Sequence, residues 1–245
     1  IDYFVIIEGN KTWQNNHKTF KFDIKKFKKF EDKIIYIKVE DLPDGKDPYL
    51  RENFQRNSIN KGLLKAKDND IIMISDLDEI PNPKVINLFK PKMKYASFKQ
   101  KHFYYKFNLQ STNHPYWLGT RICVKKYLKS PQWLRDLKFK KRPFWRIDKL
   151  NLNNIINNGG WHFCNLKNPD LLLYKYKNLC ETNDPVNFKE MIDEKYLNIN
   201  EIKKRIENGK DIIGREDNFK KIELDNSFPD YLINNKAKYK DWIEL

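Results

Sequence analysis

The alternation of apolar and polar segments in the first half of the chain predicts strands and helices in turn. Apolar segments rich in β-branched and aromatic residues occur at residues 3–7, 33–39 and 71–75. Between them lie an amphipathic stretch at 19–30 and a helix that begins at Asp47 and Pro48 and runs to about residue 66. This rhythm is typical of a parallel sheet with helical crossovers. On the helix we expect Leu50, Phe54, Leu63 and Leu64 to face the sheet.

After Phe89 the pattern changes to extended, aromatic segments, which predict antiparallel strands that extend or flank the sheet. These segments cover residues 95–99, 102–107 and 116–126. The tail from Asn168 has helical patterns that begin at Asn168-Pro169, at 187 and at 201, and the last of them is closed by Gly209. With 245 residues, 40% of them hydrophobic, the chain has material for one sizeable core, so we predict a single domain over residues 1–245.

Three carboxylates, Asp76, Asp78 and Glu79, follow directly on the apolar run at 71–74. Such a run predicts a strand buried on both faces, as in parallel sheets, with the acids at its carboxyl end, where ligands bind in α/β folds. Crowded carboxylates repel one another unless a cation neutralises them, and oxygen ligands suit Mg²⁺ or Mn²⁺ bridging to a phosphate. The alternative is a turn with Asn82 as the N-cap of a helix that begins at Pro83. The residues alone leave both interpretations open.

Two further segments contain candidate ligands. In NNGGWHFCNL (157–166), Gly159 and Gly160 allow a close backbone approach or a positive φ, and His162 is either a metal ligand or, as local sequence favours, a hydrogen-bonded core histidine. The segment WLGTR (117–121) has two interpretations. Either Gly119 leaves room for a ligand and Arg121 binds a phosphate, or Gly119 is an edge-strand glycine and Arg121 a surface arginine.

The formal net charge of +15 favours anionic partners such as nucleic acid, acidic lipids or phosphorylated glycans. Its lysines are spread over the whole length, and no zinc-finger or RRM signature accompanies them, so we expect no nucleic-acid partner and keep an anionic membrane surface as a candidate for peripheral association. No apolar run has the length of a membrane span and no leader is evident, which favours a cytoplasmic protein. The three cysteines lack metal-ligand spacing and are expected to be core thiols.

Several motifs together resemble glycosyltransferase family 17, the β-1,4-mannosyl-glycoprotein 4-β-N-acetylglucosaminyltransferase family. The resemblance covers nearly the whole chain. It rests on FVIIEGNKTWQN (4–15), PYLRENFQRN (48–57), DIIMISDLDEIP (70–81), GTR (119–121), SPQWLRDL (130–137), GGWHF (159–163) and IKKRIENGKDI (202–212). The run into DLDEIP, followed some eighty residues later by GGWHF, is its most specific part.

This resemblance implies an α/β fold of the GT-A type, with a mostly parallel central sheet flanked by helices. Its nucleotide-sugar-binding half would cover about residues 1–95, and its acceptor half, with a helical tail, about 96–245. It implies a UDP-sugar donor, a glycan acceptor and inversion at the anomeric carbon. Among UDP-sugars it favours UDP-N-acetylglucosamine. Asp76 and Asp78 would bind Mn²⁺ or Mg²⁺, and His162 matches the C-terminal metal-binding histidine of GT-A enzymes.

The mechanism expected from this resemblance is one in-line displacement with a single general base. Asp136 is the first candidate for the base, with Glu79 and Asp148 as rivals. Glu8 and Asn10 would meet the uridine, and Arg51 or Arg121 a phosphate. Two other classes stay open: a metal-dependent phosphodiester hydrolase or phosphoryl-transfer enzyme, and a non-catalytic glycan- or nucleic-acid-binding module.

Overall fold

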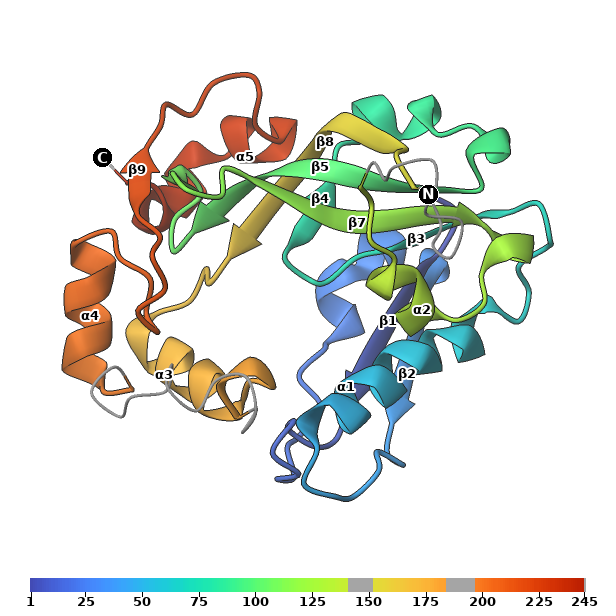
Figure 1. Ribbon diagram of the computed structural model, residues 1–245, viewed down its shortest axis with the longest axis horizontal. Coiled ribbons are helices and arrows are strands. Elements are labelled where there is room, and N and C mark those ends of the chain that lie inside the picture. Colours follow the sequence, from blue (N-terminus) through green and yellow to red (C-terminus); the bar gives the residue numbers. More distant parts are fainter. Residues whose placement is uncertain (141–151, 184–196, 245) are drawn as a thin grey trace, which may run out of the picture.

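The computed structural model describes residues 1–140, 152–183 and 197–244, and its chain begins with two parallel strands (Figure 1). β1 (Phe4–Gly9) pairs with β2 (Ile34–Val39), and the 3₁₀ helix η1 (Ile24–Lys33) connects them. α1 (Pro48–Asn57) and the 3₁₀ helix η2 (Ser58–Leu63) follow. Asp47 caps α1 by accepting a hydrogen bond from the Tyr49 N–H at 2.9 Å. The predicted order of strand, crossover, strand and helix is confirmed here.

α1 buries an arginine where we expected apolar side chains. Leu50, Phe54 and Leu64 are 47%, 36% and 86% exposed, so their predicted contact with the sheet is wrong. Arg51 is 1% exposed, and its guanidinium donates to the carbonyls of Trp13, Pro43 and Gly45. The helix is oriented by these carbonyls, because a buried guanidinium must satisfy its donors.

The main sheet is mostly antiparallel, so the prediction of a mostly parallel sheet is wrong. Its strands run in the order β3-β7-β5-β6-β9, while β8 pairs with both β4 and β5. Only the β5–β8 pair is parallel within this sheet, among the described residues. The strands are β3 (Ile71–Ile74), β4 (Glu79–Pro81), β5 (Tyr95–Tyr104), β6 (Leu109–Ser111), β7 (Tyr116–Val124), β8 (Ile155–Cys164) and β9 (Phe219–Lys221).

The direction of the strands follows from short connections. β5, β6 and β7 succeed one another with no helix between them, and a parallel neighbour would need a long crossover. β3 pairs only with β7 among the described strands, and it buries alternate residues, Ile72 and Ile74, while Ile71 is 49% exposed. The expected burial of this strand on both faces is therefore also wrong.

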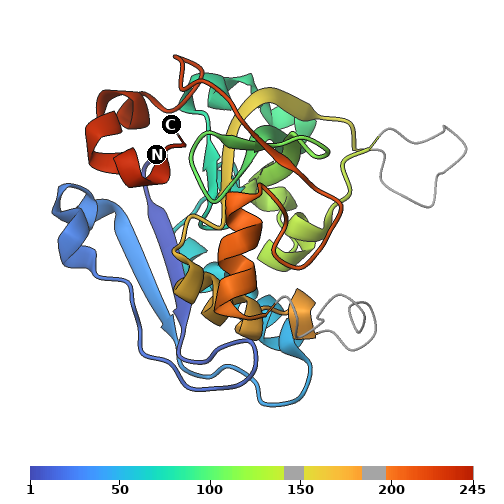
Figure 2. The same cartoon turned by 90° about the vertical axis from the view of Figure 1, so that its left-hand side faces the viewer.

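Helices cover the sheet and form the tail (Figure 2). Asn168 caps α3 (Pro169–Asn178), and Asn198 caps α4 (Ile199–Glu207). Gly209 follows α4 at φ +59°. These helices confirm the first and last of the three predicted in the tail. The expected helix at 187–196 lies outside the described residues. The remaining helices are α2 (Pro131–Asp136), α5 (Asp230–Asn234) and the 3₁₀ segments η3 (Pro83–Leu88), η4 (Pro91–Met93), η5 (Lys125–Tyr127), η6 (Glu181–Asn183) and η7 (Lys236–Trp242).

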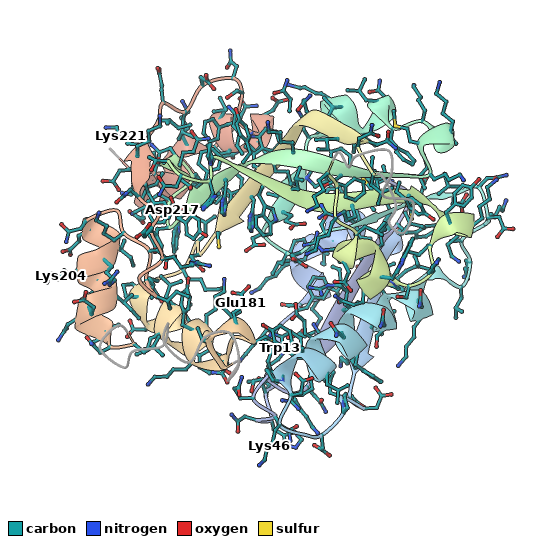
Figure 3. The ribbon with its side chains drawn as sticks, in the orientation of Figure 1. Trp13, Lys46, Glu181, Lys204, Asp217 and Lys221 are labelled. Atoms are coloured by element: carbon teal, nitrogen blue, oxygen red, sulfur yellow. The ribbon has the colours of Figure 1, made fainter. Side chains whose placement is uncertain are left out.

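The tip of the β1–β2–α1 part and the strand β9 lie on different sides of the molecule (Figure 1). In Figure 3, Lys46 lies at the lower tip of the β1–β2–α1 part, well away from Lys221 in β9 and from Asp217. Within the described residues, none of the helices has the length and apolarity of a membrane span. The three cysteines are free thiols, and Cys123 and Cys180 are buried as predicted.

Candidate active site

The three acids lie where the chain passes from β3 to β4. The Glu79 N–H donates to the Asp76 carbonyl at 3.0 Å and the Phe163 N–H donates to the Asp78 carbonyl at 2.9 Å, which fixes the turn against β8. The side chains of Asp76 and Asp78 are 42% and 33% exposed, whereas that of Glu79 is fully buried. Two carboxylates are thus open to solvent at the carboxyl end of β3, and the third is enclosed.

Glu79 forms a buried, bidentate ion pair with Arg135 of α2. Both guanidinium contacts are 2.9 Å long, and the Trp117 indole N–H and the Asp76 N–H donate to the same carboxylate at 2.9 and 3.2 Å. Burial opposes the charge of Arg135, but the neighbouring Asp76 and Glu79 outweigh it and raise the pKa of Arg135. An anion held by four donors suits a structural role better than the predicted role of a base.

Asp76 contacts two arginines that sequence reasoning missed. Arg135 Nη2 lies 2.7 Å from one of its oxygens, and Arg56 Nη2 of α1 lies 3.2 Å from the other. Arg56 also pairs with Glu52 at 2.8 Å. The sequence indicated that the crowded acids need positive charge nearby. The protein supplies part of this positive charge with its own arginines. Both arginines lie in the motifs PYLRENFQRN and SPQWLRDL, where charge balance was the available signal.

Asp78 faces the histidine of the GGWHF motif. His162 is 9% exposed and pairs with Glu79 in the β4–β8 register, and its Nε2 lies 3.3 Å from Asp78 Oδ1. Burial would raise the pKa of Asp78, but the hydrogen bond and charge of His162, together with the charge of Lys175, outweigh burial and lower it. The structure therefore brings together two of the residues predicted as metal ligands.

A sequence profile of glycosyltransferase family 17 matches residues 1–242. The chain belongs to glycosyltransferase family 17. A search of curated proteins returned no match, and neither did a search of solved structures. The family places the acid cluster in an enzyme that takes a sugar from a donor and transfers it to an acceptor.

In this glycosyltransferase the other predicted phosphate and ligand contacts face the protein. Arg121 is 9% exposed and donates to the Leu118 and Gly119 carbonyls, both at 2.6 Å, and to Ser97. Burial, with a smaller effect of the charge of Arg135, lowers the pKa of Arg121 to about 10. A Cβ on Gly119 would lie 1.7 Å from Gln100 Oε1, so a protein side chain fills the space beside this glycine. Arg51, as described above, binds loop carbonyls.

The residues predicted at the uridine lie at the end of β1. Glu8 accepts from the Lys21 and Phe22 N–H groups at 2.7 and 2.9 Å. Burial would raise the pKa of Glu8, but these hydrogen bonds, with that of Tyr36, outweigh it and lower the pKa. Asn10 donates to the Glu40 carbonyl at 3.2 Å, while its Oδ1 is buried without a hydrogen-bond partner among the described residues. Asn10 thus has an acceptor left for a ligand.

Asp136, the first candidate for the base, lies exposed at the end of α2. It accepts from Gln132 Nε2 at 2.8 Å, and the oxygen of the same amide accepts from Arg56, which contacts Asp76. A chain of hydrogen bonds therefore connects Asp136 to the acid cluster. The rival Asp148 lies outside the described residues.

Proposed function

We propose that this glycosyltransferase transfers a sugar, most of all N-acetylglucosamine, from a UDP-sugar to a glycan hydroxyl with inversion and with help from a divalent cation. The observation that carries the proposal is the pair of solvent-open carboxylates, Asp76 and Asp78, at the end of β3 in a family 17 chain. Carboxylate oxygens are the ligands that suit Mg²⁺ or Mn²⁺ bridging to a phosphate.

The donor atoms and the local charge fit Mn²⁺ or Mg²⁺. Asp76 and Glu79 contact the guanidiniums of Arg56 and Arg135, Glu52 also pairs with Arg56, and Asp78 faces His162. These four carboxylates outnumber the two guanidiniums and the nearby Lys175, which leaves an excess of negative charge. Each open carboxylate keeps lone pairs for a cation, since one carboxylate accepts about four contacts. Asp78 would hold the ion together with Asp76, and His162 would assist by holding the Asp78 carboxylate through Nε2. A bound divalent cation supplies charge to the donor diphosphate as UDP departs.

The chain's own residues then perform the remaining tasks. Arg56, Arg135 and Lys175 are cations around the two open acids and attract the diphosphate of the donor. At the carboxyl end of β1, the unpaired Oδ1 of Asn10 suits the N3–H of uracil. Asp136, exposed and joined to the cluster through Gln132, would take the proton from the acceptor hydroxyl as the glycosidic bond forms.

The test is release of UDP from a panel of UDP-sugars with Mn²⁺ and without an acceptor. We expect slow hydrolysis of one donor, and a loss of about 10²-fold or more in Asp78→Asn, on the scale of removing a preorganised electrostatic contact. Asp70→Asn is the matched control, because Asp70 directly precedes the other end of β3 and its side chain accepts from the Lys67 N–H of a turn at 2.8 Å. It should keep wild-type activity.

Two results would contradict this proposal. Near-normal turnover of Asp78→Asn, with the variant folded, would move the cation to other ligands. Cleavage of simple phosphodiesters with no release of UDP would instead favour a phosphoryl-transfer enzyme, and binding of glycans without any turnover would favour a binding module.

Inversion gives a separate prediction. A single displacement with one base opposite the leaving group converts an α-linked donor into a β-glycoside. The anomeric coupling constant of the product, measured by NMR once an acceptor is found, should report the β configuration. An α product would refute the single-base mechanism while leaving the transferase activity itself intact.

A further inference from the structure

Behind Asp78, on the inner side of the sheet, lies a cluster of two histidines and a cysteine. His102 of β5 and His162 of β8 are directly paired in the parallel register, and Cys164 lies two residues further along β8, on the same face as His162. The two histidines are 5% and 9% exposed. One nitrogen from each ring and the sulfur of Cys164 all lie within 4.8 Å of one another.

Each imidazole has one nitrogen with a partner and one without. His102 Nδ1 lies 3.1 Å from the His114 carbonyl, and because a carbonyl only accepts, this nitrogen carries the proton. His162 Nε2 likewise faces the Asp78 carboxylate. The other two nitrogens, His102 Nε2 and His162 Nδ1, are buried without a partner in the part of the chain that the structure describes. A buried polar atom left unpaired is costly, so each such atom calls for a ligand.

This arrangement is the one in which metal-binding histidines are normally held. A ligating histidine donates its other N–H to a carboxylate or a backbone carbonyl, which fixes the tautomer and turns the lone pair of the free nitrogen toward the ion. Asp78 and the His114 carbonyl occupy those two outer positions. The lone pairs of the two rings are thereby left on His102 Nε2 and His162 Nδ1, the two buried nitrogens without a partner among the described residues.

We propose that His102 Nε2, His162 Nδ1 and Cys164 Sγ form a binding site for a thiophilic divalent transition metal of the zinc class. Two imidazoles and a thiolate are soft ligands that select such ions over Mg²⁺ and Mn²⁺. A tetrahedral site with Zn–N of about 2.0–2.1 Å and Zn–S of about 2.3 Å holds its ligand atoms about 3.3–3.6 Å apart. The three side chains therefore close in on the ion by a modest movement.

The stacking of the two imidazole rings determines how the side chains move when the ion binds. The two rings are stacked, with centroids 4.8 Å apart and planes 1° from parallel. An ion lies in the plane of an imidazole that binds it, so one ring rotates about its Cβ–Cγ bond on binding. Trp117, whose ring centroid is 5.8 Å from that of His102 and 5.4 Å from that of His162, lines the side of this cluster.

The metal site also determines what His162 does in glycosyl transfer. This role of His162 rests on the proposed function. A neutral imidazole presents a lone pair on only one nitrogen. When His162 binds the buried ion through Nδ1, its Nε2–H holds the Asp78 carboxylate, and the cation of the donor is left to the two open acids. The buried site itself stands on geometry alone and does not depend on the glycosyl transfer.

The test is titration of the purified 245-residue chain with Co²⁺, a spectroscopic substitute for Zn²⁺, in the absence of nucleotide sugars. We expect one equivalent to bind, with a thiolate-to-cobalt charge-transfer band and the intense visible bands of a tetrahedral ion. Cys164→Ser should abolish the charge-transfer band. His102→Gln should weaken binding by at least about 10-fold, because even the loss of an outer partner of a ligand costs about 10–100-fold. Addition of Zn²⁺ should displace Co²⁺ from the wild type.

Cys123→Ser is the matched control, because Cys123 is a buried free thiol of the same sheet but lies on β7 outside the cluster. It should retain the full cobalt spectrum. Since Cys164→Ser or His102→Gln could be destabilised, X-ray absorption on the zinc-loaded wild type provides a measurement without any variant. Both sulfur and nitrogen should appear in the first shell of the ion.

Three results would overturn the site: a wild-type spectrum without a sulfur band, a first shell of oxygen and nitrogen only, or a band that survives in folded Cys164→Ser. Because no UDP-sugar is present, these results do not depend on the proposed function. Conversely, Asp78→Asn keeps an amide oxygen that can accept from His162 Nε2–H, so loss of UDP release with a retained cobalt band would support the proposed function and this site as separate features.

Discussion

At the scale of single residues, the sequence identified positions whose chemistry is restricted. Gly159 and Gly160 were predicted to allow a close backbone approach or a positive φ, and Gly160 has φ +126° while its α-carbon faces the backbone of β4. Asp47 and Asn168 cap helices as predicted, and Asn82 caps η3, as the alternative interpretation of the acid cluster expected. Such local rules succeed because they depend on neighbours in the sequence. The partners of His162 and Glu79 come from other strands, and no local rule could supply them.

Gly160→Ala should destabilise the fold severely. A Cβ at this position would lie 2.0 Å from the Ile80 carbonyl oxygen and 2.7 Å from the Asn82 nitrogen, both of them backbone atoms that cannot rotate away. The strained φ adds about 1–3 kcal/mol. We expect a loss of more than about 3 kcal/mol in the free energy of unfolding, measured by urea denaturation.

Gly45→Ala separates the two causes. Gly45 has the same φ, +126°, but a Cβ there meets nothing within 4 Å. This variant should lose only the conformational part, about 1–3 kcal/mol. Equal losses in the two variants would show that the contact with β4 contributes nothing and that the backbone shifts to admit a methyl group.

At the scale of elements, β1, β2, β3 and β7 followed from the pattern, but the direction of β3 did not. β5 was expected as two segments, and β4, β6, β8 and β9 were not expected as strands. The run at 71–74 forms a strand with acids at its carboxyl end, as predicted, yet its neighbour is the antiparallel β7. Apolar runs contain no information on direction, and the βαβ rhythm of the first part was extended beyond β2, where it ends. α1 also shows that a helix can bury Arg51 while Leu50 stays exposed, because hydrogen bonds to loop carbonyls determined which face turned inward.

The buried ion pair of Arg135 and Glu79 connects α2 to the β3–β4 turn, and Arg135→Met should remove this connection. Removing the arginine leaves the fully buried Glu79 without its counter-charge, which costs about 3–5 kcal/mol. The expected result is a matching fall in the free energy of unfolding in urea. Because Arg135 also contacts Asp76, release of UDP should fall as well.

Two variants control this measurement. Lys84→Met removes an ion pair whose side chains are 66% and 70% exposed, and it should cost less than about 1 kcal/mol. The double variant Arg135→Met/Glu79→Gln removes both charges and should recover part of the stability lost in the single variant. A single variant as stable as Lys84→Met would mean that solvent or another cation compensates Glu79.

At the scale of the whole molecule, the candidate site is composite. Its acids come from the β3–β4 turn, its arginines from α1 and α2, and His162 from β8. The sequence motifs include most of these segments, and the family profile matches residues 1–242. The motifs do not show which of their side chains contact one another. In SPQWLRDL the sequence pointed to Asp136, but it is Arg135 that contacts Asp76. In PYLRENFQRN it pointed to Arg51, but it is Arg56 that contacts Asp76.

The composite site predicts that binding of UDP depends on a divalent cation. Asp76 and Asp78 repel the diphosphate, and Arg56 and Arg135 are partly engaged with acids, so a cation is needed to bridge the two groups of anions. In isothermal titration calorimetry the affinity for UDP should fall by at least about 10-fold with EDTA, or about 1.4 kcal/mol, and recover with Mn²⁺. Asp78→Asn should bind UDP weakly with or without Mn²⁺, whereas Asp70→Asn should behave as the wild type. Affinity that is unchanged by EDTA in the wild type would mean that the arginines and Lys175 hold the diphosphate by themselves.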